Sequence, residues 1–277
     1  MSSIRVLVDS TAGVNPELAR RWGLGVVPFY LTWGERTYRD GMDLLPGDFY
    51  RMLAEADVNP KTAAPNPGDF GKECVAAFES GHDGVVIVSP SPKMSAAHPN
   101  ACSAARELSE DRVKVVDSGQ GAGAQALTAG RAAAVAARGA AIAEVVAAAE
   151  EARDRTELFM AVSTFRYLRR SGRLSPTRAM MGEAISLKPI LTFSDGALSV
   201  IEKPRTMHRA IDRLMALATA GDLRQALVMY ADDPSRAEEL RRTLAERMPA
   251  ASVDISPVSG VVGGHTGPGL LGIALLR

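Results

Sequence analysis

The stretch Ile4-Arg5-Val6-Leu7-Val8-Asp9-Ser10-Thr11 decides the fold, because an apolar run typical of a β-strand ends there in three polar residues. Runs of the same kind follow at residues 25–31, 84–88 and 113–116. Helical segments lie between them, and Asn15-Pro16 and Asn66-Pro67 each place a helix N-cap residue before a proline. This alternation predicts an α/β fold with a parallel sheet flanked by helices.

Polar triplets follow three of these strands. They are Asp9-Ser10-Thr11, Ser89-Pro90-Ser91 and Asp117-Ser118-Gly119. Parallel sheets bind ligands at the carboxyl ends of their strands, so the triplets are expected along one rim of the sheet. Each triplet alone is better explained as a polar cap that ends its strand.

The pattern changes from about Thr156. Strands are expected at residues 158–162, 188–193, 197–201 and 270–276, with a hairpin turn at Ser194-Asp195-Gly196. A chain of 277 residues is longer than one core usually organises. We therefore expect two domains, residues 1–155 with a parallel sheet and residues 156–277 with a mixed sheet, and a ligand site at their interface.

Composition excludes several classes of protein. The chain balances 32 Lys and Arg against 32 Asp and Glu, which gives no reason to expect nucleic acid or an anionic membrane as partner. The N-terminus enters a strand pattern at once and lacks the layout of a signal peptide, so a cytoplasmic location is expected. The Ala-rich stretch 121–149 carries Arg131, Arg138 and Glu144, and no membrane span is expected there.

Metal and nucleotide motifs are weak in this sequence. Cys74 and Cys102 have no ligand spacing, and the two carboxylates of Asp40-Gly41-Met42-Asp43 have no further spaced partners, so no metal site is predicted. Neither a G-x-x-x-x-G-K-[ST] phosphate loop nor a G-x-S-x-G nucleophile elbow occurs. We therefore predict no catalytic residue and no cofactor.

The stretch Gly263-Gly264-His265-Thr266-Gly267-Pro268-Gly269-Leu270-Leu271-Gly272 suggests anion recognition. Glycines let backbone N–H groups approach a ligand, and the His265 imidazole can donate or accept a hydrogen bond at neutral pH. The formal G-x-G-x-x-G match needs a helix after it, and none is expected before Arg277. A tight turn with a surface histidine is the alternative.

Three other places carry candidate binding residues. Thr62 lies among prolines that hold its loop extended, and Ser95 precedes a predicted helix whose N-terminus favours anions. The group Arg169-Arg170-Ser171-Gly172-Arg173, with Arg205, supplies guanidinium groups that can bind phosphate. A structural loop, a helix cap and a solvated basic corner are the respective alternatives.

Together these segments resemble the DegV family of fatty-acid-binding proteins, the carrier subunits of bacterial fatty acid kinase. The resemblance rests on the order of seven stretches along the chain: Val8-Asp9-Ser10-Thr11, Tyr38-Arg39-Asp40-Gly41-Met42-Asp43, Lys61-Thr62-Ala63-Ala64-Pro65-Asn66-Pro67-Gly68-Asp69-Phe70, Val115-Val116-Asp117-Ser118, Tyr167-Leu168-Arg169-Arg170-Ser171-Gly172-Arg173-Leu174-Ser175, Lys188-Pro189-Ile190-Leu191 and His265-Thr266-Gly267-Pro268-Gly269.

The resemblance implies a non-catalytic protein that buries the tail of a long-chain fatty acid and presents its carboxylate to a separate ATP-dependent kinase. By position, Thr62, Ser95, His265 and Thr266 would bind the carboxylate. Asp40, Arg170, Arg173 and Arg205 would face the kinase or the acyl phosphate, with the arginines further from the carboxylate than the hydroxyls.

The loops around Thr62 and Ser95 depart from the family pattern. The family usually has Thr-Ser-Gln-Pro-Ser where this chain has Thr62-Ala63-Ala64-Pro65-Asn66, and the loop before Ser95 carries Pro90 and Pro92 in place of the usual residues. Two other functions stay open: a hydrolase using Ser95 and His265 on an acyl or phosphate ester, and a lipid-sensing regulatory protein.

Overall fold

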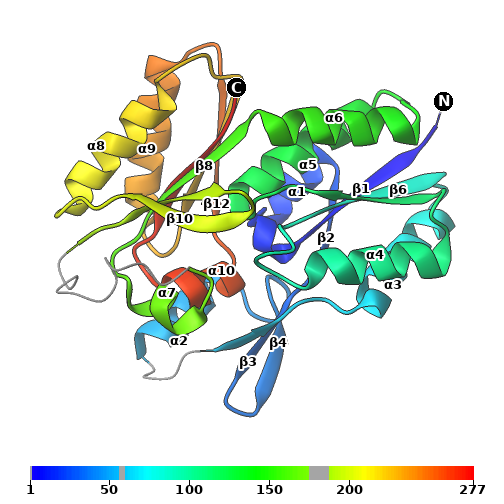
Figure 1. Ribbon diagram of the computed structural model, residues 1–277, viewed down its shortest axis with the longest axis horizontal. Helices are drawn as coiled ribbons and strands as arrows, with labels where there is room; N and C mark the ends of the chain where they lie inside the picture. The colour runs from blue at the N-terminus through cyan, green and yellow to red at the C-terminus, as the bar shows by residue number, and fades with distance from the viewer. Residues whose placement is uncertain (1, 56–59, 175–186) are drawn as a thin grey trace.

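The computed structural model describes residues 2–55, 60–174 and 187–277, in which a parallel sheet, a mixed sheet and a small third sheet are present (Figure 1). Ser175, part of one stretch that carries the family resemblance, lies outside these residues.

The parallel sheet has the order β2-β1-β6-β7 and is formed by Leu24–Val27, Ile4–Asp9, Gly84–Ser89 and Val113–Asp117. Helices α3 (Pro67–Glu79) and α4 (Ala97–Leu108) cover one face, and α5 (Ala122–Ala136) and α6 (Ile142–Asp154) cover the other (Figure 1). The side chains of Asn15 and Asn66 cap α1 (Pro16–Trp22) and α3, as their positions before proline predict.

The second sheet is mixed and has the order β10-β9-β8-β13-β11-β12. Its strands are, in that order, Ala197–Glu202, Ile190–Ser194, Thr156–Ala161, Leu271–Leu276, Gln225–Tyr230 and Ser252–Pro257. The predicted hairpin joins β9 and β10, and both Asp195 (φ 49°) and Gly196 (φ 76°) adopt the positive φ that a tight two-residue turn requires. Helices α8 (Met207–Ala218) and α9 (Pro234–Arg247) cover its outer face (Figure 1).

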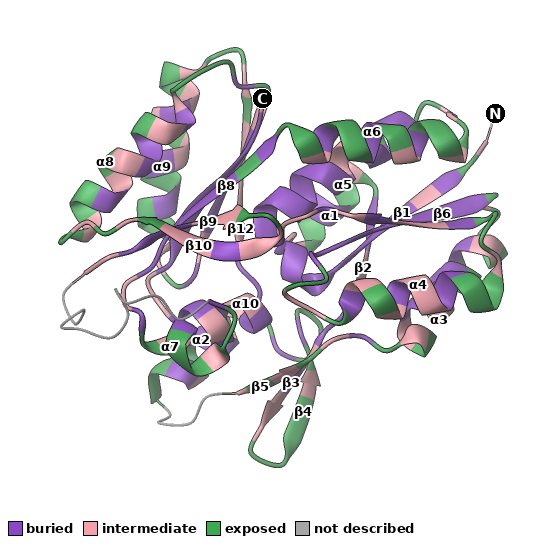
Figure 2. Cartoon of the chain, viewed as in Figure 1, coloured by how far each residue is buried: buried purple, intermediate pink, exposed green. Residues whose placement is uncertain are grey.

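Helix α5 joins the two larger sheets. It packs against β1 of the parallel sheet and against β8, β11 and β13 of the mixed sheet, and it is buried along most of its length (Figure 2). Its small side chains allow this close approach: a Cβ at Gly123 would come within 2.5 Å of Met229 Sδ. The first part of the Ala-rich stretch, helix α5, is therefore a buried helix between two sheets.

The predicted single strand at residues 25–31 is wrong. The chain breaks at Pro28, which has no N–H for a sheet ladder, and continues as β3 (Tyr30–Trp33) in the third sheet. That sheet has the order β4-β3-β5, with β4 at Arg36–Arg39 and β5 at Lys61–Ala63. Thr62 thus lies on an edge strand, consistent with the extended, proline-bounded loop expected from the sequence.

The glycine-rich stretch near the C-terminus contains a helix that the sequence did not predict. Helix α10 (Gly260–Thr266) begins at Ser259, whose hydroxyl accepts a hydrogen bond from the Val262 N–H at 3.2 Å. Gly260 and Gly263 allow the helix to pack on α2 (Pro46–Glu55), because a Cβ at either position would lie 3.0 Å or less from a ring carbon of Phe49. His265 is therefore held on the last turn of a helix.

Candidate functional site

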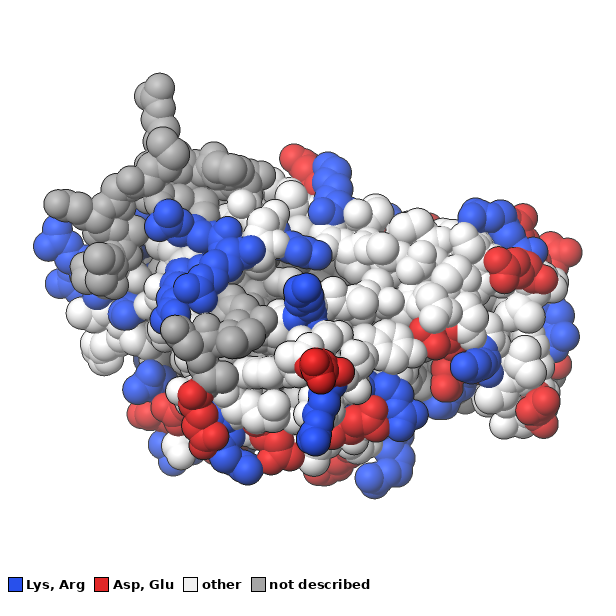
Figure 3. Space-filling view, turned by 90° about the horizontal axis from the view of Figure 1, so that it is seen from below, with Lys and Arg blue, Asp and Glu red and all other residues white. Residues whose placement is uncertain are grey.

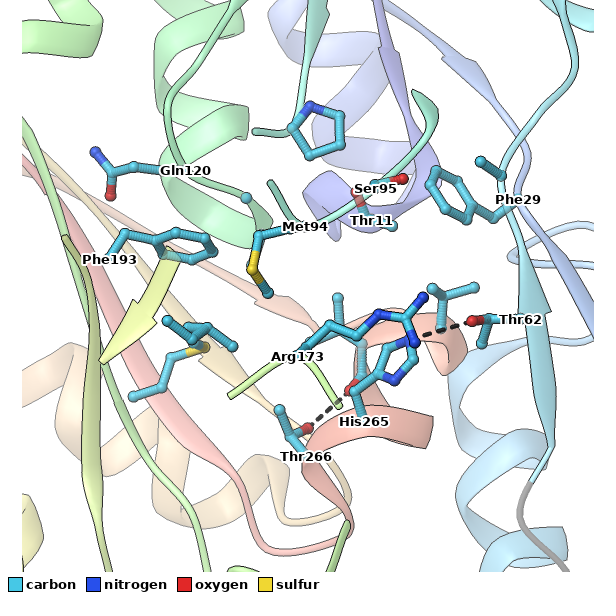
Figure 4. Close-up of a pocket in the computed structure, with 18 of the residues that line it drawn as sticks. Thr11, Phe29, Thr62, Met94, Ser95, Gln120, Arg173, Phe193, His265 and Thr266 are labelled. Carbon is cyan, nitrogen blue, oxygen red and sulfur yellow. Dashed lines mark hydrogen bonds between the residues drawn. The ribbon is translucent and has the colours of Figure 1, made fainter. Parts of the chain in front are cut away.

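A cavity of about 270 Å³ lies where the carboxyl ends of the parallel strands meet α10, β5 and the β9–β10 hairpin (Figure 4). The following residues line it: Thr11, Phe29, Thr62, Ala64, Pro90, Met94, Ser95, Ala96, Gln120, Gly121, Ala122, Met160, Arg173, Phe193, Leu198, Val261, Val262, His265 and Thr266. Thr11, Pro90 and Gln120 come from the loops after β1, β6 and β7, so the rim predicted from the sequence forms one wall.

One end of the cavity is polar. The Thr62 hydroxyl and the His265 Nε2 atom are 3.2 Å apart, which brings β5 and α10 together (Figure 4). Burial and, as the smaller cause, the positive charge of Arg173 together lower the pKa of His265 from 6.5 to about 4. The imidazole is therefore neutral at physiological pH and has one donor and one acceptor nitrogen.

Arg173, Ser95 and Thr266 complete this end. Arg173 follows α7 (Arg166–Ser171) and the left-handed Gly172, and its guanidinium lies beside the His265 ring (Figure 4). The Ser95 hydroxyl accepts a hydrogen bond from the Ala97 N–H at 3.1 Å, so its own hydrogen is free to be donated. The Thr266 hydroxyl donates to the Val262 carbonyl at 2.9 Å within α10.

The other end of the cavity is apolar. Phe193 lies there, on the side opposite Thr62 and His265 (Figure 4), and Leu198 pairs with it across the β9–β10 hairpin. Met94 and Met160 also line the cavity. The cavity is thus amphipathic, with hydrogen-bonding groups and one cation at one end and mainly apolar surface at the other, where Gln120 lies beside Phe193 (Figure 4).

A buried polar network supports the wall at Thr11. The Thr11 hydroxyl donates to the Asp9 carboxylate, and the Gln125 side chain donates to Asp9 Oδ2 at 2.9 Å and to the Val88 carbonyl at 3.0 Å. Complete burial raises the Asp9 pKa to about 6, against the lowering effect of these hydrogen bonds. The network ties α5 to the ends of β1 and β6.

Asp40 is not at the surface, which corrects the prediction that it faces a kinase or a phosphate. It is 1% exposed. Its carboxylate accepts hydrogen bonds from the Ser10 hydroxyl at 2.7 Å and from the Gly260 N–H at 3.0 Å, the first backbone donor of α10. Asp40 therefore positions the helix that carries His265.

The predicted arginines separate into two groups. Arg173 lines the cavity beside His265, so it lies closer to the expected carboxylate site than the sequence suggested. Arg170 and Arg205 are exposed and are not among the cavity residues. Figure 3 shows Lys and Arg side chains gathered on one face of the molecule, and Arg166, Arg169 and Arg170 of α7 contribute exposed guanidinium groups.

The described residues offer little for a metal. Among them, no group of three or more His, Cys, Asp or Glu side chains is placed to hold an ion. Cys74 and Cys102 are free thiols, Cys74 buried and Cys102 partly so. Within the same residues no helix is long and apolar enough to cross a membrane.

The fold and the cavity define an α/β protein with an internal ligand cavity that is polar at one end and apolar at the other. The chain belongs to the DegV family, whose model, described as an uncharacterised protein family, matches residues 3–277. A DegV domain-containing protein of Streptomyces coelicolor is 35% identical over 98% of both chains, and one of Mycobacterium tuberculosis is 34% identical over 99% of this chain and 97% of its own.

Solved structures show the same fold. A DegV family protein of Thermus thermophilus, described by its fatty acid binding, superposes with a TM-score of 0.90 at 28% identity and covers 99% of both chains. DegV of Bacillus subtilis, described as a fatty acid binding protein, gives a TM-score of 0.89 at 26% identity over the whole of both chains. The predicted family and fold class are confirmed.

Proposed function

We propose that this protein binds a long-chain fatty acid in the amphipathic cavity and presents the carboxylate to a separate ATP-dependent fatty acid kinase in the cytoplasm. The observation that carries the proposal is the cavity itself, because Thr62, Ser95, Arg173 and His265 lie at one end and an apolar wall at the other. The fatty acid binding of DegV relatives from Thermus thermophilus and Bacillus subtilis supports the same ligand class.

The polar end suits a carboxylate. If the neutral His265 carries its proton on Nε2, it donates to the Thr62 oxygen, and the Thr62 hydrogen is then free for the ligand. Ser95 offers a second hydroxyl hydrogen, and Arg173 supplies the positive charge that a buried anion requires. The Thr266 hydroxyl already donates its hydrogen to the Val262 carbonyl within α10, so Thr266 would line the site without donating that hydrogen to the carboxylate.

The apolar end would supply most of the affinity. Each methylene transferred from water contributes about 0.8 kcal/mol, so a long acyl tail supplies on the order of 10 kcal/mol before the cost of ordering it. The contacts to the carboxylate then serve to orient the ligand more than to supply affinity.

Phosphoryl transfer would come from the partner. The sequence has no nucleotide phosphate loop, and the exposed Arg170 and Arg205 are free to contact a kinase or a developing acyl phosphate outside the cavity. Arg173, at the cavity itself, would act on the carboxylate and on the transferred phosphoryl group.

Reconstitution tests this proposal. Acyl phosphate is expected only when the protein, a fatty acid, ATP and the kinase are all present. Arg170→Ala and Arg205→Ala should lower turnover by the kinase while fatty acid binding stays unchanged, and Arg242→Ala on α9, far from the cavity, serves as the matched control. Acyl phosphate formed without the kinase, or ester hydrolysis that depends on Ser95 and His265, would contradict the proposal in favour of an enzyme.

A further inference from the structure

Two cavities meet at the apolar end of the proposed fatty acid site. Beyond it lies a second cavity of about 340 Å³ between the β9–β10 hairpin, the loop after β7 and the start of β8. Among the described residues, Gln120 and Phe193 are the two that line both cavities. These two side chains therefore form the partition between them.

Gln120 is the fixed part of this partition. Its side-chain amide donates to the Thr156 carbonyl at 2.6 Å, and its backbone carbonyl accepts a hydrogen bond from the Ser91 N–H at 2.7 Å. Moving Gln120 would break both contacts, so it is a poor candidate for adjusting the length of the cavity.

Phe193 is the part of the partition held by packing alone. Its ring lies against Gly121, where a Cβ would be 3.5 Å from the Phe193 Cζ atom, and a phenyl group makes no hydrogen bond that would fix it. In Figure 4 it stands at the end of the cavity opposite Thr62 and His265. An acyl tail that starts at the polar end would therefore meet this ring.

The second cavity differs in character from the first. Arg153 and Asp154 line it and form an ion pair at 2.8 Å, and Glu157 and Asp195 add two more carboxylates. Desolvating these charges without replacing their hydrogen bonds is unfavourable, so a tail that enters this cavity would follow its apolar lining residues, Leu158 and Phe159. The Phe193 ring separates apolar from charged surface.

We propose that Phe193 sets the longest acyl chain that this protein accepts. The inference rests on the proposed fatty acid binding and deepens it. A cavity of about 270 Å³ lies just below the range of about 300–1,000 Å³ of ligand pockets, so its end wall limits what fits. Without the ring, the two cavities join and the tail gains the additional room beyond it.

Competition among chain lengths tests the proposal. Delipidated wild type, Phe193→Ala and the control Ile201→Ala, an exposed residue of the same hairpin, are each offered an equimolar mixture of saturated fatty acids from laurate to behenate. The bound acids are then extracted and quantified. One more buried methylene is worth about fourfold in affinity, so the ratio of bound behenate to palmitate should rise at least about tenfold in Phe193→Ala and stay unchanged in Ile201→Ala.

Phe193→Leu should raise the ratio of bound behenate to palmitate by a smaller factor. If Phe193→Ala binds no fatty acid at all, Phe193→Leu takes its place as the test variant. A wild-type chain-length profile in a Phe193 variant that binds fatty acid would overturn the role of Phe193 and leave the proposed function intact. A wild type that binds none of the acids would overturn both.

Discussion

Thr62 connects the polar end of the cavity to the rest of the protein, since its hydroxyl is in contact with His265 on a different element. Thr62→Ala removes a proposed hydrogen bond to a carboxylate. A hydrogen bond to a charged group is worth about 1.5–3 kcal/mol, so fatty acid affinity should fall tenfold or more.

Equilibrium binding of a fluorescent fatty acid measures this effect. Thr62→Ser, which keeps the hydroxyl, should recover most of the affinity. Thr37→Ala removes a more exposed threonine of the same three-stranded sheet and should bind as the wild type does. Wild-type affinity in Thr62→Ala would show that the carboxylate is anchored elsewhere.

His265 should titrate at about pH 4 in the protein without fatty acid. Because burial and then Arg173 lower its pKa, Arg173→Ala should raise it, whereas Arg170→Ala, outside the cavity, should not. The pKa is measured by NMR from the chemical shift of the His265 ring protons as a function of pH. The His265→Gln variant identifies which signal belongs to His265. A pKa unmoved by Arg173→Ala would place Arg173 away from the imidazole.

The lowered pKa of His265 also makes the free energy of unfolding depend on pH. Between about pH 4 and 6.5 the unfolded chain binds a proton at this residue that the folded protein does not. The contribution of His265 to the free energy of unfolding is therefore complete above about pH 6.5 and is lost as the pH falls toward 4.

At the scale of elements, the packing of α10 on α2 positions His265. A Cβ at Gly263 would lie 2.4 Å from the Tyr50 hydroxyl, whereas a Cβ at Gly264 would meet nothing closer than 3.4 Å. Gly263→Ala should therefore lower the free energy of unfolding by about 1–3 kcal/mol through overpacking, and Gly264→Ala should not.

Tyr50→Phe checks the cause. The Tyr50 hydroxyl is buried and has no hydrogen-bond partner among the described residues, so its removal opens space beside Gly263. Denaturant unfolding should show a smaller penalty for Gly263→Ala in the Tyr50→Phe background. Equal penalties in the two backgrounds would rule out this contact as the cause.

Asp40 links the end of β4 to the start of α10, and its titration should be visible in stability. Burial raises its pKa from 3.8 to about 6, so between these values the folded protein binds a proton that the unfolded chain releases. The free energy of unfolding relative to Asp40→Asn should therefore fall as the pH rises from about 4 to 6, by on the order of 3 kcal/mol. Urea unfolding at several pH values measures it, and a pH-independent difference would contradict the raised pKa.

The elements differ in how far the sequence predicts them. The strands β1, β6 and β7 are confirmed, and the apolar runs of β1 and β6 are continuous in sequence because these two strands are buried on both faces. The sheet of β3, β4 and β5 was missed because its strands are only three or four residues long and β4 is largely exposed. Helix α10 was missed because its glycines disfavour a helix locally and are explained only by the rings of Phe49 and Tyr50.

The same contrast holds for the site. Local chemistry together with the family resemblance singles out Thr62, Ser95, His265 and Thr266, and the structure brings all four to one cavity. That Asp40 is buried and that Arg173 lies beside His265 depend on contacts between distant parts of the chain, which no local pattern contains.

At the scale of the whole molecule, the cavity lies where the parallel and mixed sheets approach each other through α5. Met160, Phe193 and Leu198 come from the mixed sheet, and Thr11, Pro90 and Gln120 come from the rim of the parallel sheet. The division into residues 1–155 and 156–277 stays a prediction. A ligand in this cavity would contact both sheets, and its binding is expected to stabilise the protein as a whole.

The content of the cavity in purified protein tests the central claim most directly. Native mass spectrometry of protein from a heterologous host, followed by organic extraction, should show close to one non-covalently bound fatty acid per chain. Delipidated protein should take up added oleate or palmitate to the same occupancy. Repeated extraction without stoichiometric fatty acid, together with no uptake of either added acid, would contradict the proposal that this cavity is a fatty acid site.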